Sequence, residues 1–365
     1  MSRTTIHSPY MEYAKHDSAA RFSLASSGIR NYPFAELQVD SSKLEISDSS
    51  PYGYPPLIDR LAKKSVVAPE CVVAINGGTS LANNLAIAAT TEPGDDVLIE
   101  TPGYELLDTT ARFLGLNVQH FQRRFEDRYA LDVRQIERCL TPRTRLIIIT
   151  NLHNPSGVLV ANDTLRSIGD VARIAGARVL VDEVYLDLLF DRMPPSSFHL
   201  DPKVFVVTTS LTKAYGLSGL RCGWILAEPE LAQRLWRIHD VYASTPVHIA
   251  ERLSVIALDN LSGIAARARA LIAANRPVLD DFLRSRKDLD VVSPEFGTVV
   301  FPRLKQGSVD ALHSLAHQKY EAGFVPGKFF GSSDHFRLGI GGDPTETREA
   351  LHRLSRALDE LSGAS

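Results

Sequence analysis

Short apolar runs rich in valine and isoleucine recur along residues 72–227, and helical patterns separate them. The clearest run is Leu146–Thr150, which reads LIIIT and is apolar on both faces of a strand. The same character is shared by Val72–Ile75, Val97–Glu100, Val118–Phe121, Val179–Asp182, Val204–Thr208 and Trp224–Ala227. Such strands, separated by helices, are typical of a mostly parallel sheet covered on both faces. Ligands of these sheets bind beyond the carboxyl ends of the strands, so we expect the chemistry there.

The pattern changes after Pro229. A helical stretch with a break near Thr245-Pro246 reaches Leu258, and a long helix is predicted over Ile264–Ser285. Further strands are predicted at Val291–Phe301 and Phe336–Ile340, and further helices at Val309–Glu321 and Thr345–Leu361. This mixture indicates a second, smaller α+β domain. A short helix is predicted near Met11–Arg21 in the polar N-terminal segment.

The composition excludes several classes of protein. With 365 residues, 44% of them hydrophobic, the chain can bury a large core and is not a disordered protein. Its net charge of −3 argues against a nucleic-acid binder. It has neither an apolar stretch of about 18 residues nor a signal-peptide core, so we expect no membrane partner. Three scattered cysteines argue against a disulfide framework and favour a reduced, cytoplasmic compartment.

Glycines and hydroxyls follow the first strand as Asn76-Gly77-Gly78-Thr79-Ser80, immediately before a helix. Backbone N–H groups at such a helix start favour an anion such as phosphate. An ordinary strand-to-helix turn is the alternative.

Two later strands also end in polar side chains. NLHNPSG follows Thr150 and brings Asn154 to the strand end, although Asn-Pro-Ser-Gly is also a good turn sequence. Asp182 ends another buried strand and is followed closely by Tyr185. A buried acid is costly unless it is paired, so Asp182 is either a functional group or the N-cap of a helix.

The segment after the next strand reads SLTKAYGLSGLRCGW, from Ser210 to Trp224. Taken alone, Lys213 is a solvated surface lysine more often than a functional one. Ser210 and Arg221 lie on the same glycine-containing segment, and their presence favours a functional Lys213. Together the strand ends offer an anion cradle, a lysine, an acid, an amide and a phenol. A phosphorylated pyridine aldehyde needs this set, with the lysine as its Schiff-base partner and the acid at its ring nitrogen.

The chain resembles the class I/II aminotransferases, which are fold type I enzymes dependent on pyridoxal 5'-phosphate (PLP). The resemblance covers residues 24–361 and rests on motifs in the family's order: GGT, PGY, NLHNPSG, VLVDEVY, SLTKAYGLSGLRCGW, VPGKFFG and FRLGIGG. The Ser-x-x-Lys segment with Arg221 eight positions after Lys213 is the most specific of these.

The resemblance implies roles for individual residues. Lys213 would form the Schiff base and later move the Cα proton, and Asp182 would pair with the pyridine nitrogen. Tyr185 and Asn154 would contact the ring hydroxyl, and Tyr104 would stack on the ring. The phosphate would be held by Gly77, Gly78, Thr79, Ser210 and Arg221. The substrate would be bound by Arg337 at its α-carboxylate, assisted by Asn154, with Gly28 in the loop that closes over it.

Two departures from the family pattern limit the resemblance. The tyrosine that reaches the partner subunit's phosphate has no clear match, because Tyr52 and Tyr54 both lie in SPYGYPP; Tyr52 is preferred. No motif supplies a second arginine for a substrate side chain. Apolar and aromatic residues within Ser23–Phe34 favour a neutral substrate.

The resemblance implies an α/β fold of type I. A mostly parallel, seven-stranded mixed sheet would lie in a large domain of residues 48–255, and residues 1–47 with 256–365 would form the small domain. It also implies a homodimer. The predicted reaction is ping-pong transfer of an amino group between an L-amino acid and a 2-oxo acid. The alternatives are another PLP reaction (β-lyase, decarboxylase, cyclase or oxidase) or a PLP-binding sensor module.

Three weaker signals are set aside. His313 and His317 have metal-ligand spacing but fit a polar helix face better, so no metal is expected. Cys222 fits a small buried residue better than a nucleophile. No glycine-rich dinucleotide motif follows a strand.

Overall fold

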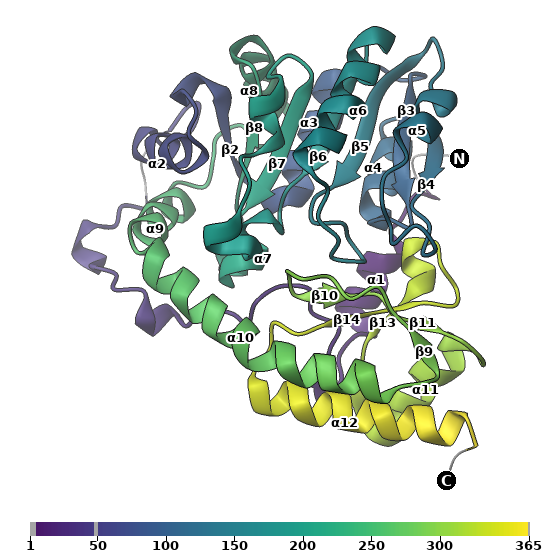
Figure 1. Cartoon of the computed structure of the whole chain (residues 1–365). Coiled ribbons are helices and arrows are strands. Elements are labelled where there is room, and N and C mark those ends of the chain that lie inside the picture. The colour runs from purple at the N-terminus through teal and green to yellow at the C-terminus, as the bar shows by residue number, and fades with distance from the viewer. Residues whose placement is uncertain (1–4, 47–49, 364–365) are drawn as a thin grey trace.

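The computed structural model describes residues 5–46 and 50–363, and Figure 1 shows their arrangement. The strands are β1 (Phe22–Ser23), β2 (Val72–Asn76), β3 (Asp96–Thr101), β4 (Asn117–Gln122), β5 (Thr144–Thr150), β6 (Arg178–Asp182), β7 (Phe205–Ser210), β8 (Cys222–Leu226), β9 (Leu289–Asp290), β10 (Val299–Val300), β11 (Arg303–Leu304), β12 (Ala322–Gly323), β13 (Val325–Pro326) and β14 (Phe336–Gly339). The α-helices are α1 (Pro9–His16), α2 (Pro55–Ser65), α3 (Gly78–Thr90), α4 (Glu105–Phe113), α5 (Val133–Cys139), α6 (Asn162–Ala175), α7 (Thr212–Tyr215), α8 (Pro229–Ala243), α9 (His248–Asp259), α10 (Leu261–Ser285), α11 (Val309–Tyr320) and α12 (Pro344–Leu361). The 3₁₀ helices are η2 (Phe34–Glu36), η3 (Ser41–Lys43), η4 (Pro69–Cys71), η5 (Leu186–Arg192), η6 (Ser197–Leu200), η7 (Ser218–Leu220) and η8 (Gly327–Phe330).

The large sheet has seven strands in the order β2-β8-β7-β6-β5-β3-β4. Strand β8 runs antiparallel to both of its neighbours, and the other pairs are parallel. The predicted α/β architecture with a mostly parallel, mixed seven-stranded sheet is therefore confirmed. The parallel strands point their carboxyl ends toward one edge, which is where a ligand site is expected.

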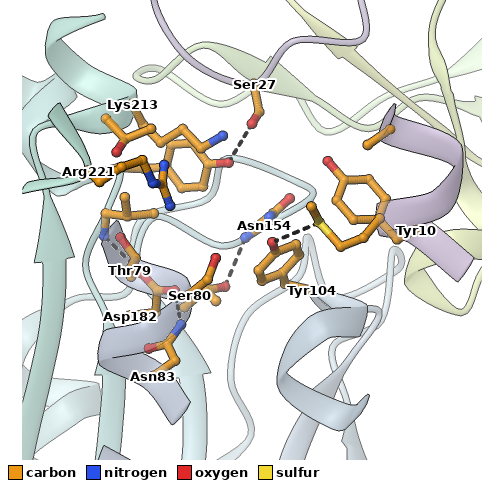
Figure 2. Close-up of a pocket in the computed structure, with 16 residues that line it drawn as sticks. Tyr10, Ser27, Thr79, Ser80, Asn83, Tyr104, Asn154, Asp182, Lys213 and Arg221 are labelled. Atoms are coloured by element: carbon orange, nitrogen blue, oxygen red, sulfur yellow. Dashed lines mark hydrogen bonds between the residues drawn. The ribbon is translucent and has the colours of Figure 1, made fainter. Parts of the chain in front are cut away.

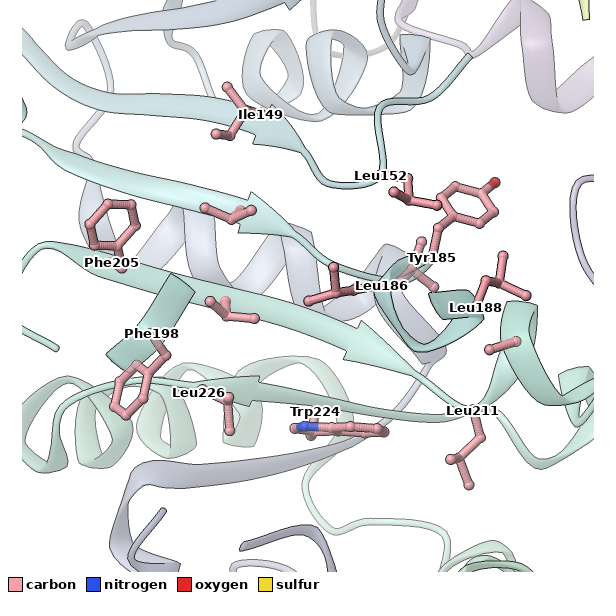
Figure 3. Close-up of a cluster of buried hydrophobic side chains, with 14 of the residues drawn as sticks. Ile149, Leu152, Tyr185, Leu186, Leu188, Phe198, Phe205, Leu211, Trp224 and Leu226 are labelled. Atoms are coloured by element: carbon pink, nitrogen blue, oxygen red, sulfur yellow. The ribbon is translucent and has the colours of Figure 1, made fainter. Parts of the chain in front are cut away.

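Both faces of the large sheet are covered, which explains why its strands are apolar throughout. Helices α3, α4 and α8 contribute buried side chains on one face. Helix α6, η6 and part of α10 contribute to a second cluster on the other face. Figure 3 shows part of this second cluster, including Ile149, Phe205 and Trp224. Removal of this apolar surface from water is the main force holding the layers together.

The C-terminal part forms a separate layer in which α10, α11 and α12 pack beside a three-stranded antiparallel sheet, β10-β14-β13 (Figure 1). The N-terminal segment joins this layer, because β1 pairs with β12 and Leu24 bonds to Gly323 and Gly339 on either side. The division into domains at 47/48 and 255/256 stays a prediction, and residues 47 and 48 lie outside the described residues.

Two predicted elements differ from the structure. The run Val291–Phe301 is not one strand: within it only Val299–Val300 pairs, because Pro294 lacks a backbone donor and Gly297 turns the chain with φ +82°. The N-terminal helix ends at His16 and does not continue to Arg21. Within the described ranges, no helix is long and apolar enough to span a membrane.

Candidate active site

A cavity of about 250 Å³ lies at the carboxyl ends of the central strands (Figure 2). Strand ends and helix starts of the large sheet supply one wall, and the N-terminal segment supplies the other. The cavity is lined by Tyr10, Met11, Ala14, Ser27, Thr79, Ser80, Asn83, Tyr104, Thr150, Asn154, Asp182, Val184, Tyr185, Thr212, Lys213 and Arg221. Seven of the residues that were given roles from the sequence are among them, drawn together from segments far apart in the chain.

The start of helix α3 forms an anion cradle. Within the described residues no side chain caps this helix; its Gly78 N–H donates to the Arg221 carbonyl at 2.9 Å, and the N–H groups that follow are available to a ligand. The Thr79 hydroxyl donates to Ser210 at 2.9 Å, and Arg221 reaches across to donate from Nη2 to the Gly77 carbonyl at 2.6 Å. The Thr212 hydroxyl is buried beside them and has no hydrogen-bond partner among the described residues. An anion here would meet a guanidinium, hydroxyls and the positive end of a helix dipole.

Gly78 shows why a glycine stands in this cradle. Its φ is +64°, and an added Cβ would lie only 2.6 Å from Nη2 of Arg221. Gly223 on β8 packs against it, because a Cβ there would lie 2.7 Å from the Gly78 carbonyl carbon. Only a residue without a side chain allows this close approach of backbone and guanidinium.

Asp182 is a buried carboxyl at the end of β6. It accepts hydrogen bonds from Asn83 Nδ2 at 2.8 Å and from the Val184 N–H at 3.1 Å. Burial raises its pKa to about 6, although both hydrogen bonds and the charge of Lys213 oppose that rise. Asn83 is itself oriented by the Thr208 hydroxyl, which donates to its Oδ1 at 2.5 Å. A cationic ligand atom beside Asp182 would relieve the cost of keeping this carboxylate ionised.

Lys213 lies on α7 directly after β7, and the N-terminal segment packs on its backbone. Its carbonyl accepts from the Ile29 N–H at 2.8 Å. A Cβ on Gly28 would stand 3.2 Å from both Cα and Cδ of Lys213, so a glycine lets the loop pass closely. Within the described residues, Nζ of Lys213 has no hydrogen-bond or ion-pair partner. An amine that lines the cavity without a partner is available to a ligand.

Arg337 on β14 is buried and does not itself line the cavity, but it bonds to Asn154 and Tyr10, which do. Nη1 donates to Asn154 Oδ1 at 3.0 Å, and Nη2 donates to the Tyr10 hydroxyl and the Ala25 carbonyl at 3.1 Å each. Nε has no partner. The Asn154 backbone N–H is held at 2.9 Å by the Thr150 hydroxyl. A guanidinium with an unused donor is suited to a carboxylate.

Two predicted aromatic residues complete the walls. Tyr185 donates its hydroxyl to Ser27 at 2.8 Å, which ties the end of β6 to the N-terminal segment. Tyr104 precedes α4 and meets Tyr10 edge-on with ring centroids 5.6 Å apart. Burial raises the pKa of Tyr104 well above its ordinary value, so its hydroxyl stays protonated.

Tyr52 does not reach the cavity of its own chain. It is 44% exposed, lies edge-on to Trp236 and accepts a hydrogen bond from Arg237. Tyr54 lies instead near His248, with its backbone N–H bonded to Glu251 at 3.0 Å. Whether either tyrosine reaches a partner subunit stays a prediction.

Sequence reasoning gave no role to several cavity residues, among them Tyr10, Ser27, Asn83 and Thr212. A signal existed for Asn83, because an asparagine inside the apolar helix 81–89 is disfavoured without a partner. Thr212 stands beside Lys213 in the quoted motif. Tyr10 and Ser27 carry no local signal, since only the tertiary fold brings them to the site.

The weaker signals have structural roles. His313 bonds to the Tyr13 hydroxyl at 2.9 Å, while His317 bonds to the Ala19 carbonyl at 2.8 Å. No cluster of three metal-ligating side chains occurs in the described part of the chain. Cys222 is buried, and burial raises its pKa to about 12, so its thiol is not a nucleophile.

A family model described as "Aminotransferase class I and II" matches residues 37–354 of this chain. The chain belongs to the class I and II aminotransferase family. Its members depend on PLP, so this chain is a PLP-dependent enzyme of that family.

Individual relatives differ in their reactions. The chain is 29% identical to capreomycidine synthase of Streptomyces vinaceus, over 93% of this chain and 90% of that protein. It is 26% identical to the aspartate/prephenate aminotransferase of Thermus thermophilus, over 84% and 82% respectively. Among solved structures, a PLP-dependent aminotransferase from Streptococcus suis superposes with a TM-score of 0.89 and 23% identity, covering 96% of this chain and 97% of that one. This superposition confirms the fold.

The residues present fit PLP. The unpartnered Thr212 hydroxyl and the uncapped start of α3 suit its phosphate, and the buried Asp182 suits a protonated ring nitrogen. The free Nζ of Lys213 suits its aldehyde. In the described part of the chain, the Thr212 hydroxyl and Nζ of Lys213 have no hydrogen-bond partner, and Asp182 has hydrogen-bond donors but no cationic partner in contact; the cofactor would supply each of these.

Proposed function

We propose that this enzyme is an aminotransferase, which moves an amino group between an L-amino acid and a 2-oxo acid by a ping-pong mechanism. The observation that carries the proposal is that Lys213 shares a single cavity with residues of two recognition sites. Arg221 of the anion cradle lines this cavity, and so does Asn154, which accepts a hydrogen bond from Arg337. An amine in one cavity with a cofactor cradle and a carboxylate anchor is placed to handle a proton at the Cα of an amino acid.

The residues would divide the work as follows. Lys213 would hold PLP covalently through Nζ, with Asp182 at the ring nitrogen, Tyr185 and Asn154 at the ring hydroxyl and Tyr104 on the ring face. When bound, PLP supplies an electron sink for the charge that develops at Cα. Arg337 would anchor the substrate α-carboxylate, assisted by Asn154. Nζ of Lys213 would take the proton from Cα and hold it for redelivery.

A different reaction with the same cofactor is the second candidate. The similarity to capreomycidine synthase, over nearly the whole of both chains, supports a synthase rather than amino exchange. Because PLP carries the chemistry, the surrounding pocket decides which bond at Cα breaks.

The test is a half-reaction with PLP-loaded enzyme and no 2-oxo acid acceptor. We expect one amino donor of a panel to give one equivalent of 2-oxo acid per subunit, with chromatography detecting pyridoxamine phosphate. Many equivalents of product, or ammonia, without an acceptor would favour the second candidate. No spectral change with any of alanine, aspartate, leucine, phenylalanine or arginine would contradict an amino acid substrate.

We also infer a homodimer in which Tyr52 contacts the partner's site. Support comes from large apolar side chains that are exposed in the single chain, among them Phe34 (67%), Val241 (84%) and Val247 (54%). Sedimentation at micromolar concentration tests this. A fully active monomer would contradict it.

A further inference from the structure

Tyr10 belongs to the N-terminal helix α1, yet its side chain lines the cavity opposite Lys213 (Figure 2). Its hydroxyl accepts a hydrogen bond from Nη2 of Arg337 at 3.1 Å, across 327 positions of the chain. Arg337 itself lies behind Tyr10 and Asn154. A ligand approaching Arg337 from the cavity therefore meets the Tyr10 hydroxyl.

Hydrogen bonds on two sides hold α1 in place. Tyr13, one turn after Tyr10, donates to the Phe324 carbonyl at 2.5 Å and bonds His313 at 2.9 Å, which ties α1 to the small sheet and α11. Ser8, at the start of α1, donates to Glu105 of the large sheet's α4. The helix therefore bridges the two layers above the cavity.

The Tyr10 ring is equally constrained. It lies edge-on to Tyr104 at 5.6 Å and tilted against Phe330 at 5.8 Å, measured between ring centroids. Arg337 lies over the rings of Tyr10 and Phe330, 5.7 Å from the centroid of the first and 4.9 Å from that of the second. A ring packed on three sides leaves its hydroxyl little freedom to turn away.

The Tyr10 hydroxyl has an unused donor. A phenol that accepts a hydrogen bond still carries its own hydrogen, and within residues 5–46 and 50–363 no group accepts it. Burial by itself would raise the pKa of Tyr10, but the charges of Arg337 and Lys213 outweigh burial and hold that pKa below its ordinary value. A phenol polarised in this way donates strongly to an anion. The neighbouring Nε of Arg337 is also an unused donor.

We propose that Tyr10 is a substrate-binding residue whose hydroxyl donates a hydrogen bond to the α-carboxylate that Arg337 anchors. The two oxygens of a carboxylate match two donors from different elements, the guanidinium on β14 and the phenol on α1. This inference rests on the proposed function, because it requires an amino acid in this cavity. It predicts that α1 recognises the part of the substrate common to all amino acids.

The experiment compares Tyr10→Phe with a matched control, Tyr13→Phe, both as PLP-loaded enzymes. Each removes one hydroxyl from a buried tyrosine of α1, but only Tyr10 faces the cavity. The half-reaction is followed by absorbance with alanine, leucine, phenylalanine, aspartate and arginine. Its concentration dependence gives an apparent Kd and a limiting rate for each amino acid.

For Tyr10→Phe we expect the apparent Kd to rise about 10- to 100-fold, the range for a hydrogen bond to a charged group. The factor should be similar for every amino acid that the wild type accepts, while the limiting rate stays within about threefold. Tyr13→Phe should leave the apparent Kd within about twofold, since its hydroxyl bonds only to the protein. An unchanged Kd, or an effect confined to one substrate side chain, would show that Tyr10 does not bind the carboxylate.

A binding measurement separates this inference from the proposed function. Calorimetry would compare butanoate with its uncharged isostere butanamide on the same PLP-loaded proteins. We expect the wild type to prefer butanoate, and Tyr10→Phe to lose most of that preference without weaker binding of butanamide. A wild type without the preference would contradict the carboxylate anchor and the proposed function together. If Tyr10→Phe lost the absorption band of bound PLP, Tyr10 would be a structural residue and the inference would be wrong.

Discussion

The two walls of the cavity are built in different ways. The cofactor wall comes from the ends of β2, β6 and β7 and the helices that follow them, so its residues are set by one rigid sheet. The substrate wall comes from α1, the segment around Ser27 and β14, which belong to the smaller layer. Hydrogen bonds join the two walls, among them those from Tyr185 to Ser27 and from Arg337 to Asn154.

This difference indicates which wall binds the cofactor and which binds the substrate. A sheet buried on both faces places the cradle, Asp182 and Lys213 in fixed relation, as a cofactor common to a whole family requires. The substrate wall depends on α1 and β14 meeting across 327 positions. Changes in the first wall should affect PLP, and changes in the second should affect the amino acid.

The largest effect is expected at the cofactor wall, for Lys213→Ala. Loss of both the covalent anchor and the proton carrier should lower the half-reaction rate by at least about 1,000-fold. The visible absorption band that we expect from protein-bound PLP should lose its lysine-dependent part as well. Lys203→Ala, on an exposed turn, is the control and should behave as the wild type. Full turnover in Lys213→Ala would refute its assigned role.

On the substrate wall, Arg337→Lys should raise KM for the amino donor about 100-fold, because lysine keeps the charge but not the planar pair of donors. The affinity for PLP, measured by titration of the cofactor-free protein, should stay within about twofold. An equal loss of PLP affinity would contradict the assignment of Arg337 to a wall that binds substrate and not cofactor.

Asp182→Asn tests the cost of the buried carboxyl in the cofactor-free protein. The pKa of Asp182 is about 6 when folded, against an ordinary value of 3.8, so the folded state binds the proton more tightly. The stability contributed by that proton is present below about pH 4 and is lost as pH rises through 6. The amide that replaces the carboxyl in this variant does not titrate, so it loses no stability over the same pH range.

The variant should therefore be more stable than the wild type by about 2–3 kcal/mol at pH 8, and equal to it near pH 4. Urea unfolding at a series of pH values measures the difference. A difference independent of pH would mean that Asp182 does not titrate between the two conditions.

The smallest effect is expected for Gly78→Ala in the cradle. A side chain at φ +64° is strained and would displace Arg221, so PLP affinity should fall about tenfold. Gly219→Ala is the matched control in the same region, since no atom lies within 4 Å of its added Cβ. Calorimetric titration with PLP measures the affinity of both variants. Equal PLP affinities would show that Gly78 is not required in the cradle.

The strands of the large sheet were predictable from the sequence because burial on both faces makes them apolar throughout, as in β5. Prediction failed over Val291–Phe301, where apolar residues lie in a segment interrupted by Pro294 and Gly297. Apolar character there reflects contact with the rest of the fold and not strand pairing. The cradle and Lys213 were predictable because short segments carry them whole.

The residues of the substrate wall were harder to predict from the sequence. Arg337 came from the family resemblance, and nothing local marks Tyr10, whose neighbours in sequence are ordinary residues of an amphipathic helix. Asn83 lay between these cases, since a polar residue inside an apolar helix could have indicated a buried partner.

The sequence by itself determined the strand ends, the lysine segment and the glycine-lined cradle, because backbone geometry couples residues that are close in the chain. The tertiary structure alone decided that α1 lines the cavity, that Tyr10 meets Arg337 and that Ser27 meets Tyr185. Those pairs form because two separate layers each bury an apolar face and dock against each other. No local rule of hydrogen bonding or helix periodicity specifies such a contact before the layers have packed.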